Sequence, residues 1–234
     1  MMSVPSSMRA IVLEAVPAPP EALVVRELPV PRPARGWVLI EVKAFGLNRS
    51  ELKTRLGFAD PDVTLPRVPG IEATGVVAAC PGGELAVGQQ VVAMMGGMGR
   101  SFDGGYAEFT CVPVAQAIPF RSDLPWTTLG AVPEMLQTAY GALTIGLDAQ
   151  PGQALLIRGG TSSVGLTAAI LAKRRGLTIL ATTRSEAKAG ALRDGGVDHV
   201  VVDDGAIAPH ARVRPRRRGR DARASGHADA ARQP

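Results

Sequence analysis

The sequence is poor in cysteine, and it has no hydrophobic run long enough to cross a membrane. Its 234 residues include two cysteines, Cys80 and Cys111, which lie 31 positions apart and form no CxxC pair. This excludes a disulfide scaffold and a zinc ribbon, and it is typical of a reducing compartment. A membrane span needs about 20 consecutive apolar residues, so none is predicted. The start, MMSVPSSMRA, lacks the apolar core of a signal peptide, and we expect a cytoplasmic protein.

Large apolar residues are also missing from the end of the chain, where the basic charge is concentrated. Residues 209–234 contain one valine and no Leu, Ile, Met or aromatic residue. They carry a net charge of +6 against +5 for the whole chain, which leaves −1 for residues 1–208. Such a segment cannot offset the entropy of ordering its backbone, so we expect a disordered Arg-rich tail. No aromatic residue interleaves the arginines for base stacking, and we do not expect a nucleic-acid partner.

The first 120 residues have the pattern of a β-rich domain. Short runs rich in Val and Ile alternate with Pro and Gly clusters such as PVPRPARG and CPGGELAVG. This spacing is typical of a partly closed barrel or sandwich. One helix is predicted at 49–56, with Asn48 as its N-cap and Gly57 at its end. The predicted strands are 9–15, 22–28, 37–44, 71–79, 90–95 and 106–112.

After residue 120 the pattern changes to alternating helices and strands. The β–α–β–α–β order with short connections predicts a parallel, doubly wound sheet. We therefore expect an α/β protein with a β-rich domain over 8–120, a partial nucleotide-binding domain over 121–208, and the tail over 209–234. The predicted helices are 122–130, 133–146, 162–175 and 185–193, and the predicted strands are 154–157, 178–182 and 199–202.

A glycine-rich loop after the strand at 154–157 is the strongest functional signal. The segment GTSSVG at 160–165 fits the GxGxxG fingerprint, with Ser162 at the second glycine. A pyrophosphate site needs a tight turn, close access to the backbone, and helix N–H groups aimed at the phosphates. The alternative is a glycine-rich turn that binds nothing. The predicted cofactor contacts are Gly160, Ser162, Ser163 and Val164, with the two serines adding hydroxyl donors.

The end of the next strand indicates which dinucleotide binds. An NAD site has an acidic residue there for the ribose 2′-hydroxyl, whereas this chain has Thr182-Thr183-Arg184-Ser185. Arg184 can pair with a 2′-phosphate, the Thr183 hydroxyl can donate to it, and Lys188 lies one helical turn further on. These residues predict NADP(H). The alternative is that Arg184 is an exposed loop cation.

Seven segments in order along residues 8–202 are informative together: MRAIVLEA, VLIEVKAFGLNRSELKTRLG, LPRVPGIEATGVV, GGYAEF, MLQTAYGAL, LLIRGGTSSVG and ATTRSEAKAGALRDGGVDHVV. In this order they resemble the medium-chain dehydrogenase/reductase superfamily, and most closely its zinc-independent quinone oxidoreductase branch. The resemblance implies a GroES-like N-terminal domain followed by a partial Rossmann domain. It also implies hydride transfer from NADPH to a quinone or an α,β-unsaturated carbonyl.

The zinc-dependent members of that superfamily differ from this chain at the metal ligands. They carry Cys where this chain has Asn48, and Gly-His-Glu where it has Gly70-Ile71-Glu72. They also have four clustered cysteines where this chain reads MMGGMGRSFDGG. Zinc prefers imidazole and thiolate, so no metal site is predicted and Glu72 is expected to be structural. Catalysis would then be positioning plus stabilisation of a developing enolate or quinol oxygen.

Two site residues follow from the resemblance alone. Asn48 would be the catalytic polar contact near the nicotinamide or substrate oxygen, although its position equally favours a helix N-cap, and both roles can hold. Thr138 would contact the cofactor, and its alternative role is a hydroxyl bonded to its own helix. Related enzymes often have tyrosines shortly after this asparagine. This chain has no tyrosine there, so solvent is the simplest proton source.

The family pattern should continue after Val202 through another helix and three more strands, but the sequence becomes PHARVRPRRRGRDARASGHADAARQP. We hypothesise an out-of-frame or artificial end. Homodimers of the family commonly pair through a strand in the missing part, so that contact is expected to be absent. Two alternatives to a reductase stay open. One is a non-catalytic fragment of this family, and the other is a module that binds nucleic acid or an acidic surface through the arginines.

Overall fold

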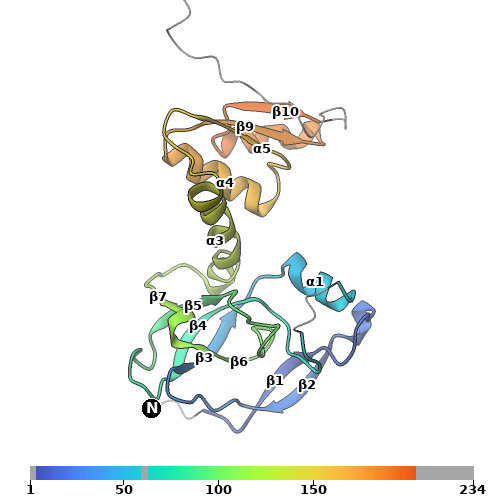
Figure 1. The fold of residues 1–234 in the computed structure, drawn as a ribbon, viewed down its shortest axis with the longest axis vertical. Coiled ribbons are helices and arrows are strands. Elements are labelled where there is room, and N and C mark those ends of the chain that lie inside the picture. The colour runs from blue at the N-terminus through green and yellow to red at the C-terminus, as the bar shows by residue number, and fades with distance from the viewer. Residues whose placement is uncertain (1–3, 59–62, 204–234) are drawn as a thin grey trace, which may run out of the picture. The chain divides into compact units, whose positions relative to one another are not determined.

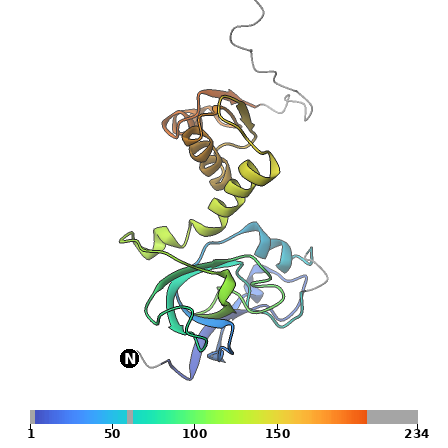
Figure 2. The same ribbon diagram turned by 60° about the vertical axis from the view of Figure 1, so that its left-hand side comes forward.

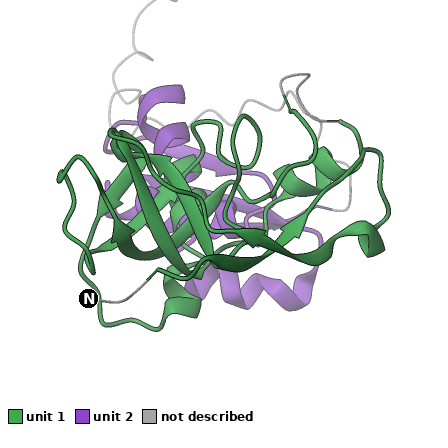
Figure 3. Cartoon of the chain, turned by 90° about the horizontal axis from the view of Figure 1, so that it is seen from below, with its two compact units in different colours: residues 1–138 green, residues 139–234 purple. Residues whose placement is uncertain are grey.

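The computed structural model describes residues 4–58 and 63–203 (Figure 1). The predicted Arg-rich tail, 209–234, lies outside the described residues. The chain divides into two compact units, 1–138 and 139–234 (Figure 3), whereas the sequence places the domain boundary at residue 120. Within the described ranges, no helix combines the length and the apolar character that a membrane span requires.

The first unit is built on a curled, five-stranded antiparallel sheet that forms a half-barrel (Figure 2). Its strand order is β6-β3-β4-β5-β7, and β1 and β2 form a separate antiparallel pair. This architecture confirms the predicted β-rich, GroES-like domain. The strands are β1 (Ser7–Val12), β2 (Val24–Pro29), β3 (Trp37–Ala44), β4 (Glu72–Ala79), β5 (Gln90–Met94), β6 (Phe109–Pro113) and β7 (Ala117–Pro119).

The core of the half-barrel comes from β-branched residues contributed by four of these strands. Their side chains are fully buried and pack in one cluster, because each strand turns one of its two faces inward. Removing this apolar area from water is the main stabilising term of the unit. The cluster includes Val38, Ile40, Val77, Val91 and Val112.

Helix α1 lies in the connection between β3 and β4, and α2 and α3 follow β7. α1 (Arg49–Arg55) begins after Asn48, and Gly57 follows it in the left-handed region at φ 79°, as predicted. α2 (Trp126–Leu129) is shorter than the predicted helix, because the residue before Pro125 is disfavoured in helical conformation. α3 (Pro133–Gly141) continues into a π-helical turn, Ala142–Gly146.

The second unit contains a three-stranded parallel sheet in the order β10-β9-β8, which confirms the predicted β–α–β–α–β arrangement. Small residues such as Ala169 and Ala172, both buried, let α4 pack closely beside the sheet. The predicted helix at 185–193 divides into a short 3-10 turn and α5. The elements are β8 (Ala154–Ile157), α4 (Ser163–Arg174), β9 (Thr178–Thr183), α5 (Ala189–Asp194) and β10 (His199–Val202).

Candidate functional site

The glycine-rich loop of the second unit leaves β8 and is attached to the end of β9. The Gly159 N–H donates to the hydroxyl oxygen of Thr182 at 3.0 Å, and the Gly160 N–H donates to the Thr182 carbonyl at 2.9 Å. Thr182 is itself buried. The loop is therefore held at the carboxyl end of the parallel sheet, where open α/β folds bind their ligands.

Two glycines of the fingerprint are required by close packing. A Cβ atom on Gly160 would lie 2.7 Å from the Ala181 Cβ, and one on Gly165 would lie 2.6 Å from the Gly159 carbonyl oxygen. A larger residue at either position would push the loop or the start of α4 aside. The first turn of α4 can thus approach the loop backbone, as a pyrophosphate site needs.

The serines of the loop have different roles. Ser162 is the N-cap of α4, because its hydroxyl oxygen accepts from the Gly165 N–H at 3.1 Å. The same hydroxyl donates to the Gly159 carbonyl at 2.9 Å, so its hydrogen is used within the loop. Ser163 and Val164 are the first two residues of α4, and N–H groups at this position have no partner within their own helix. Ligand contact by all three stays a prediction.

The cations predicted to select NADP(H) lie beyond β9. Arg184 and Lys188 are exposed, and neither forms an ion pair with another described residue. Thr183 is buried, and its hydroxyl oxygen accepts from the Ser185 N–H at 3.2 Å. Thr183 therefore shapes the turn that carries Arg184.

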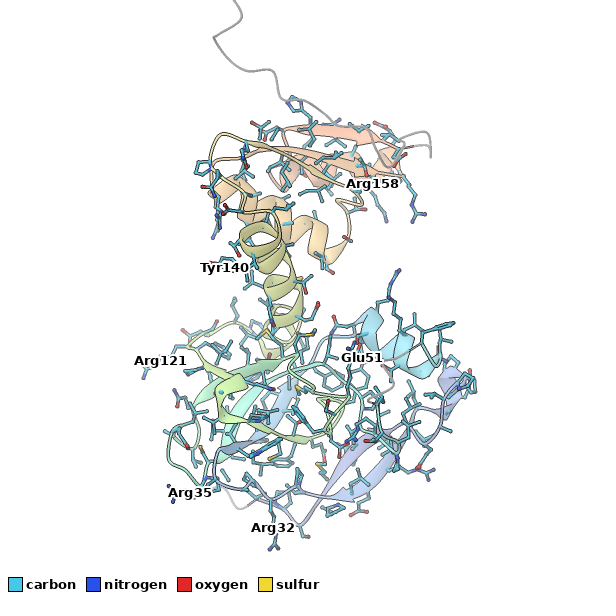
Figure 4. All side chains as sticks on the ribbon, in the orientation of Figure 1. Arg32, Arg35, Glu51, Arg121, Tyr140 and Arg158 are labelled. Carbon is cyan, nitrogen blue, oxygen red and sulfur yellow. The ribbon has the colours of Figure 1, made fainter. Side chains whose placement is uncertain are left out.

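Sequence reasoning missed an ion pair at the same edge of this sheet. Arg158, which follows β8 and is labelled in Figure 4, lies 3.6 Å from the carboxylate of Asp203. The backbone N–H of Asp203 also donates to the Thr183 carbonyl at 2.8 Å. Thr182 was missed as well. The sequence carried one signal for these contacts. Arg158, Thr182 and Asp203 all come at the carboxyl ends of neighbouring parallel strands.

In the first unit, Asn48 is hydrogen-bonded to a buried glutamate. Its side-chain Nδ2 donates to Glu72 Oε1 at 2.7 Å, and Glu72 Oε2 accepts from the backbone N–H of Glu134 at 2.9 Å. Glu72 is only 2% exposed. Burial raises the pKa of Glu72, and the hydrogen bonds from Asn48 and Glu134 oppose that shift.

A second buried carboxylate, Glu51, closes the first turn of α1 (Figure 4). It accepts from the backbone N–H of Asn48 at 3.0 Å and from that of Ile71 at 2.9 Å. Asn48 and Glu51 form a capping box, which confirms the predicted N-cap position of Asn48. Burial raises the pKa of Glu51. It also raises the pKa of Tyr106, with a further contribution from the charges of both glutamates.

Thr138 and Arg100 are two further polar residues of this unit. Thr138 is exposed, and its hydroxyl donates to Glu134 Oε1 at 2.6 Å, on the same helix. Sequence reasoning missed Arg100, whose Nη2 donates to the hydroxyl of Ser50 at 2.6 Å. The Arg100 Nε atom is buried and has no hydrogen-bond partner among the described residues.

The two buried glutamates described in the first unit, Glu72 and Glu51, are not arranged as metal ligands. Both oxygens of Glu72 and both oxygens of Glu51 face N–H donors. Over residues 4–58 and 63–203, no three His, Cys, Asp or Glu side chains gather in a way that could hold a metal ion.

Comparison with known proteins finds similarity to oxidoreductases in sequence and in fold. Residues 34–122 match the model of the alcohol dehydrogenase GroES-like domain. Human quinone oxidoreductase is 31% identical over 172 residues, which are 71% of this chain and 50% of the human protein. The chain spans about half the length of the curated relatives it matches.

Solved structures extend the similarity over both units. The crystal structure of AibC matches with a TM-score of 0.80 at 29% identity, over 86% of this chain and 63% of that one. An NAD-dependent alcohol dehydrogenase matches with a TM-score of 0.77 at 32% identity, over 83% of this chain and 63% of that one.

Proposed function

Because the chain belongs to the medium-chain dehydrogenase/reductase superfamily and is quinone oxidoreductase-like, we propose that it transfers a hydride from NADPH to a small-molecule acceptor. The acceptor class is a quinone or an α,β-unsaturated carbonyl, and the reaction uses no zinc. The observation that carries the proposal is the glycine loop that Thr182 holds at the carboxyl end of the parallel sheet.

The residues of this loop suit a dinucleotide phosphate. The close packing at Gly160 and Gly165 leaves the first turn of α4 next to the loop backbone. The N–H groups of Ser163 and Val164 would bind the pyrophosphate, since the N-terminus of a helix favours negative charge. Arg184 and Lys188, exposed and without ion pairs among the described residues, would hold the 2′-phosphate. When bound, NADPH supplies the hydride.

Asn48 supplies a hydrogen-bond donor in the first unit. An amide nitrogen carries two hydrogens, and one of them is donated to Glu72. The other would donate to the carbonyl oxygen of the acceptor and stabilise the negative charge that develops there during reduction. Quinones and activated C=C bonds accept a hydride readily, so this electrostatic help and positioning are sufficient without a Lewis acid.

Two observations support a zinc-free reaction. Asn48 stands where the zinc-dependent members have a cysteine, and an amide is a poor zinc ligand. Glu72 already accepts two N–H donors, so neither of its oxygens is free to bind a cation without breaking a hydrogen bond. A cytoplasmic location remains a prediction from the sequence.

Fluorescence titration with NADPH and NADH tests the cofactor site. We expect the protein to prefer NADPH, and Arg184→Ala to weaken NADPH binding about 10- to 100-fold, because a charge-assisted hydrogen bond contributes about 1.5–3 kcal/mol. The matched control is Arg174→Ala, which removes an exposed arginine from the opposite end of α4. Equal effects of the two substitutions, or preference for NADH, would overturn the NADP assignment.

The same titration separates the proposal from a non-catalytic fragment. A reductase binds NADPH and oxidises it when a benzoquinone is added. A fragment that binds NADPH without turnover, or binds neither nucleotide, would show that the described residues do not suffice for the activity.

A further inference from the structure

Glu72 connects the N-cap of α1 to the N-terminus of α3. One carboxylate oxygen accepts from the Asn48 side chain at 2.7 Å and the other from the Glu134 backbone at 2.9 Å. The side chain also lies against the backbone of Gly46, where a Cβ atom would come within 2.1 Å of Glu72 Oε1. With 2% exposure and neighbours on these sides, Glu72 has little freedom to move.

The chemistry of the two donors determines how Asn48 must be oriented. The Glu134 backbone N–H can only donate, so it always needs an acceptor from Glu72. An ionised carboxylate accepts hydrogen bonds and cannot donate them. Asn48 must therefore turn its nitrogen, and not its oxygen, towards Glu72.

We propose that Glu72 is a positioning residue that selects one orientation of the Asn48 amide, and thereby presents the second Nδ2 hydrogen to a carbonyl oxygen of the substrate. The substrate part of this inference rests on the proposed function. The orientation of the amide does not, because it is a property of the protein without ligands. The substrate class that follows is one with a hydrogen-bond-accepting carbonyl at the reacting end.

Protonation of Glu72 would remove its part in this selection. The neutral acid has an O–H that can donate to the Asn48 oxygen, so Glu72 no longer distinguishes the two amide orientations, and only the capping-box contact with the Glu51 backbone still favours the observed one. The titratable groups around Glu72 are Glu51 from α1, Glu134 from α3 and Tyr106, and burial raises the pKa of Glu72. Substrate positioning should therefore weaken as the pH falls through the raised pKa of Glu72.

The sequence allows a direct test, because Asn48 is its only asparagine. Protein labelled with 15N-asparagine gives a single side-chain NH2 pair in an NMR spectrum. We expect this pair to shift with pH at a midpoint above 4.5, the ordinary value for Glu. The shift should disappear in Glu72→Gln. It should remain in the matched control Glu51→Gln, which removes a buried carboxylate that contacts only backbone N–H groups.

Several outcomes would overturn the inference. The first is an NH2 pair whose chemical shift does not change with pH in the unsubstituted protein. The second is a pH-dependent shift that persists in Glu72→Gln, and the third is one that is lost in Glu51→Gln. The first of these needs no variant, so the test stands even where Glu72→Gln fails to fold.

A double-mutant cycle tests the substrate part, with a benzoquinone as acceptor. Glu72→Gln should lower kcat by up to about 100- to 1,000-fold, the effect of losing a transition-state donor. It should lower kcat no further when Asn48 is already alanine, and NADPH affinity should stay unchanged. Additive effects would show that Glu72 acts on the fold and not through Asn48. If the unsubstituted protein reduces no quinone, the proposed function fails while the NMR result still decides the orientation.

Discussion

The hydroxyl of Thr182 accepts a hydrogen bond from the backbone N–H of Gly159 at 3.0 Å, across 23 residues of sequence. This contact joins the end of β9 to the loop that follows β8. It explains how a short, glycine-rich turn keeps one conformation without a ligand.

Thr182→Val tests this contact. Valine has nearly the same shape but no oxygen, so the Gly159 N–H would lose its partner at a cost of about 1–3 kcal/mol. We expect this loss in the free energy of unfolding by urea, together with weaker NADPH binding. Thr178→Val, at the exposed start of the same strand, should change neither quantity. Equal behaviour of the two variants would contradict the role of Thr182.

Gly165→Ala tests the packing of α4 on the loop. The new Cβ atom would meet the Gly159 carbonyl oxygen at 2.6 Å, so the helix or the loop must shift. We expect lower thermal stability and loss of NADPH binding. Gly190→Ala is the control, because a Cβ there meets nothing within 4 Å on a helix of the same unit. That change should stabilise the protein by about 0.5–1 kcal/mol.

The pH dependence of stability tests the burial of Glu51. Because its folded-state pKa is raised, Glu51 favours folding below its unfolded pKa, and this contribution is lost as pH rises through the raised value. Glu51→Gln should therefore make the decline of unfolding free energy above pH 4.5 shallower. Urea unfolding at a series of pH values gives the slopes. If the slope of unfolding free energy against pH is the same in Glu51→Gln, then Glu51 has the same pKa in the folded and unfolded states.

Metal removal tests the zinc-free reaction. Dialysis against a strong chelator should leave NADPH binding and quinone reduction unchanged, since Glu72 and Glu51 are committed to N–H donors. Zinc measured by mass spectrometry in the untreated protein should be far below one ion per chain. Activity that disappears on dialysis and returns with added zinc would refute the prediction.

Local features could be predicted from the sequence because their causes lie within a few residues. Asn48 begins α1, Gly57 ends it, and β3, β8 and β10 have the predicted bounds. The helix predicted at 122–130 is shorter in the structure, where α2 begins after Pro125, because a proline disfavours helical conformation at the residue before it.

The hydroxyl groups of the loop show where local reasoning stopped. Ser162 bonds the Gly159 carbonyl and caps α4, contacts that its spacing in the sequence does not indicate, and its contact with a phosphate remains a prediction. The position of Thr182 at a strand end does not indicate that its hydroxyl holds the loop. Sequence spacing shows which residue types are present, and it does not show which of several polar neighbours each one will meet.

The sequence by itself determined the order of strands and helices, the two kinds of sheet, and the glycines of the loop, since these depend on periodicity and on turns. Only the tertiary structure decided the partners of the buried polar groups. Glu72 meets Asn48 across 24 residues and Glu134 across 62. The physical reason is that a buried carboxylate must find donors wherever the fold brings them. Those donors come from two different helices, which only folding brings to the same carboxylate.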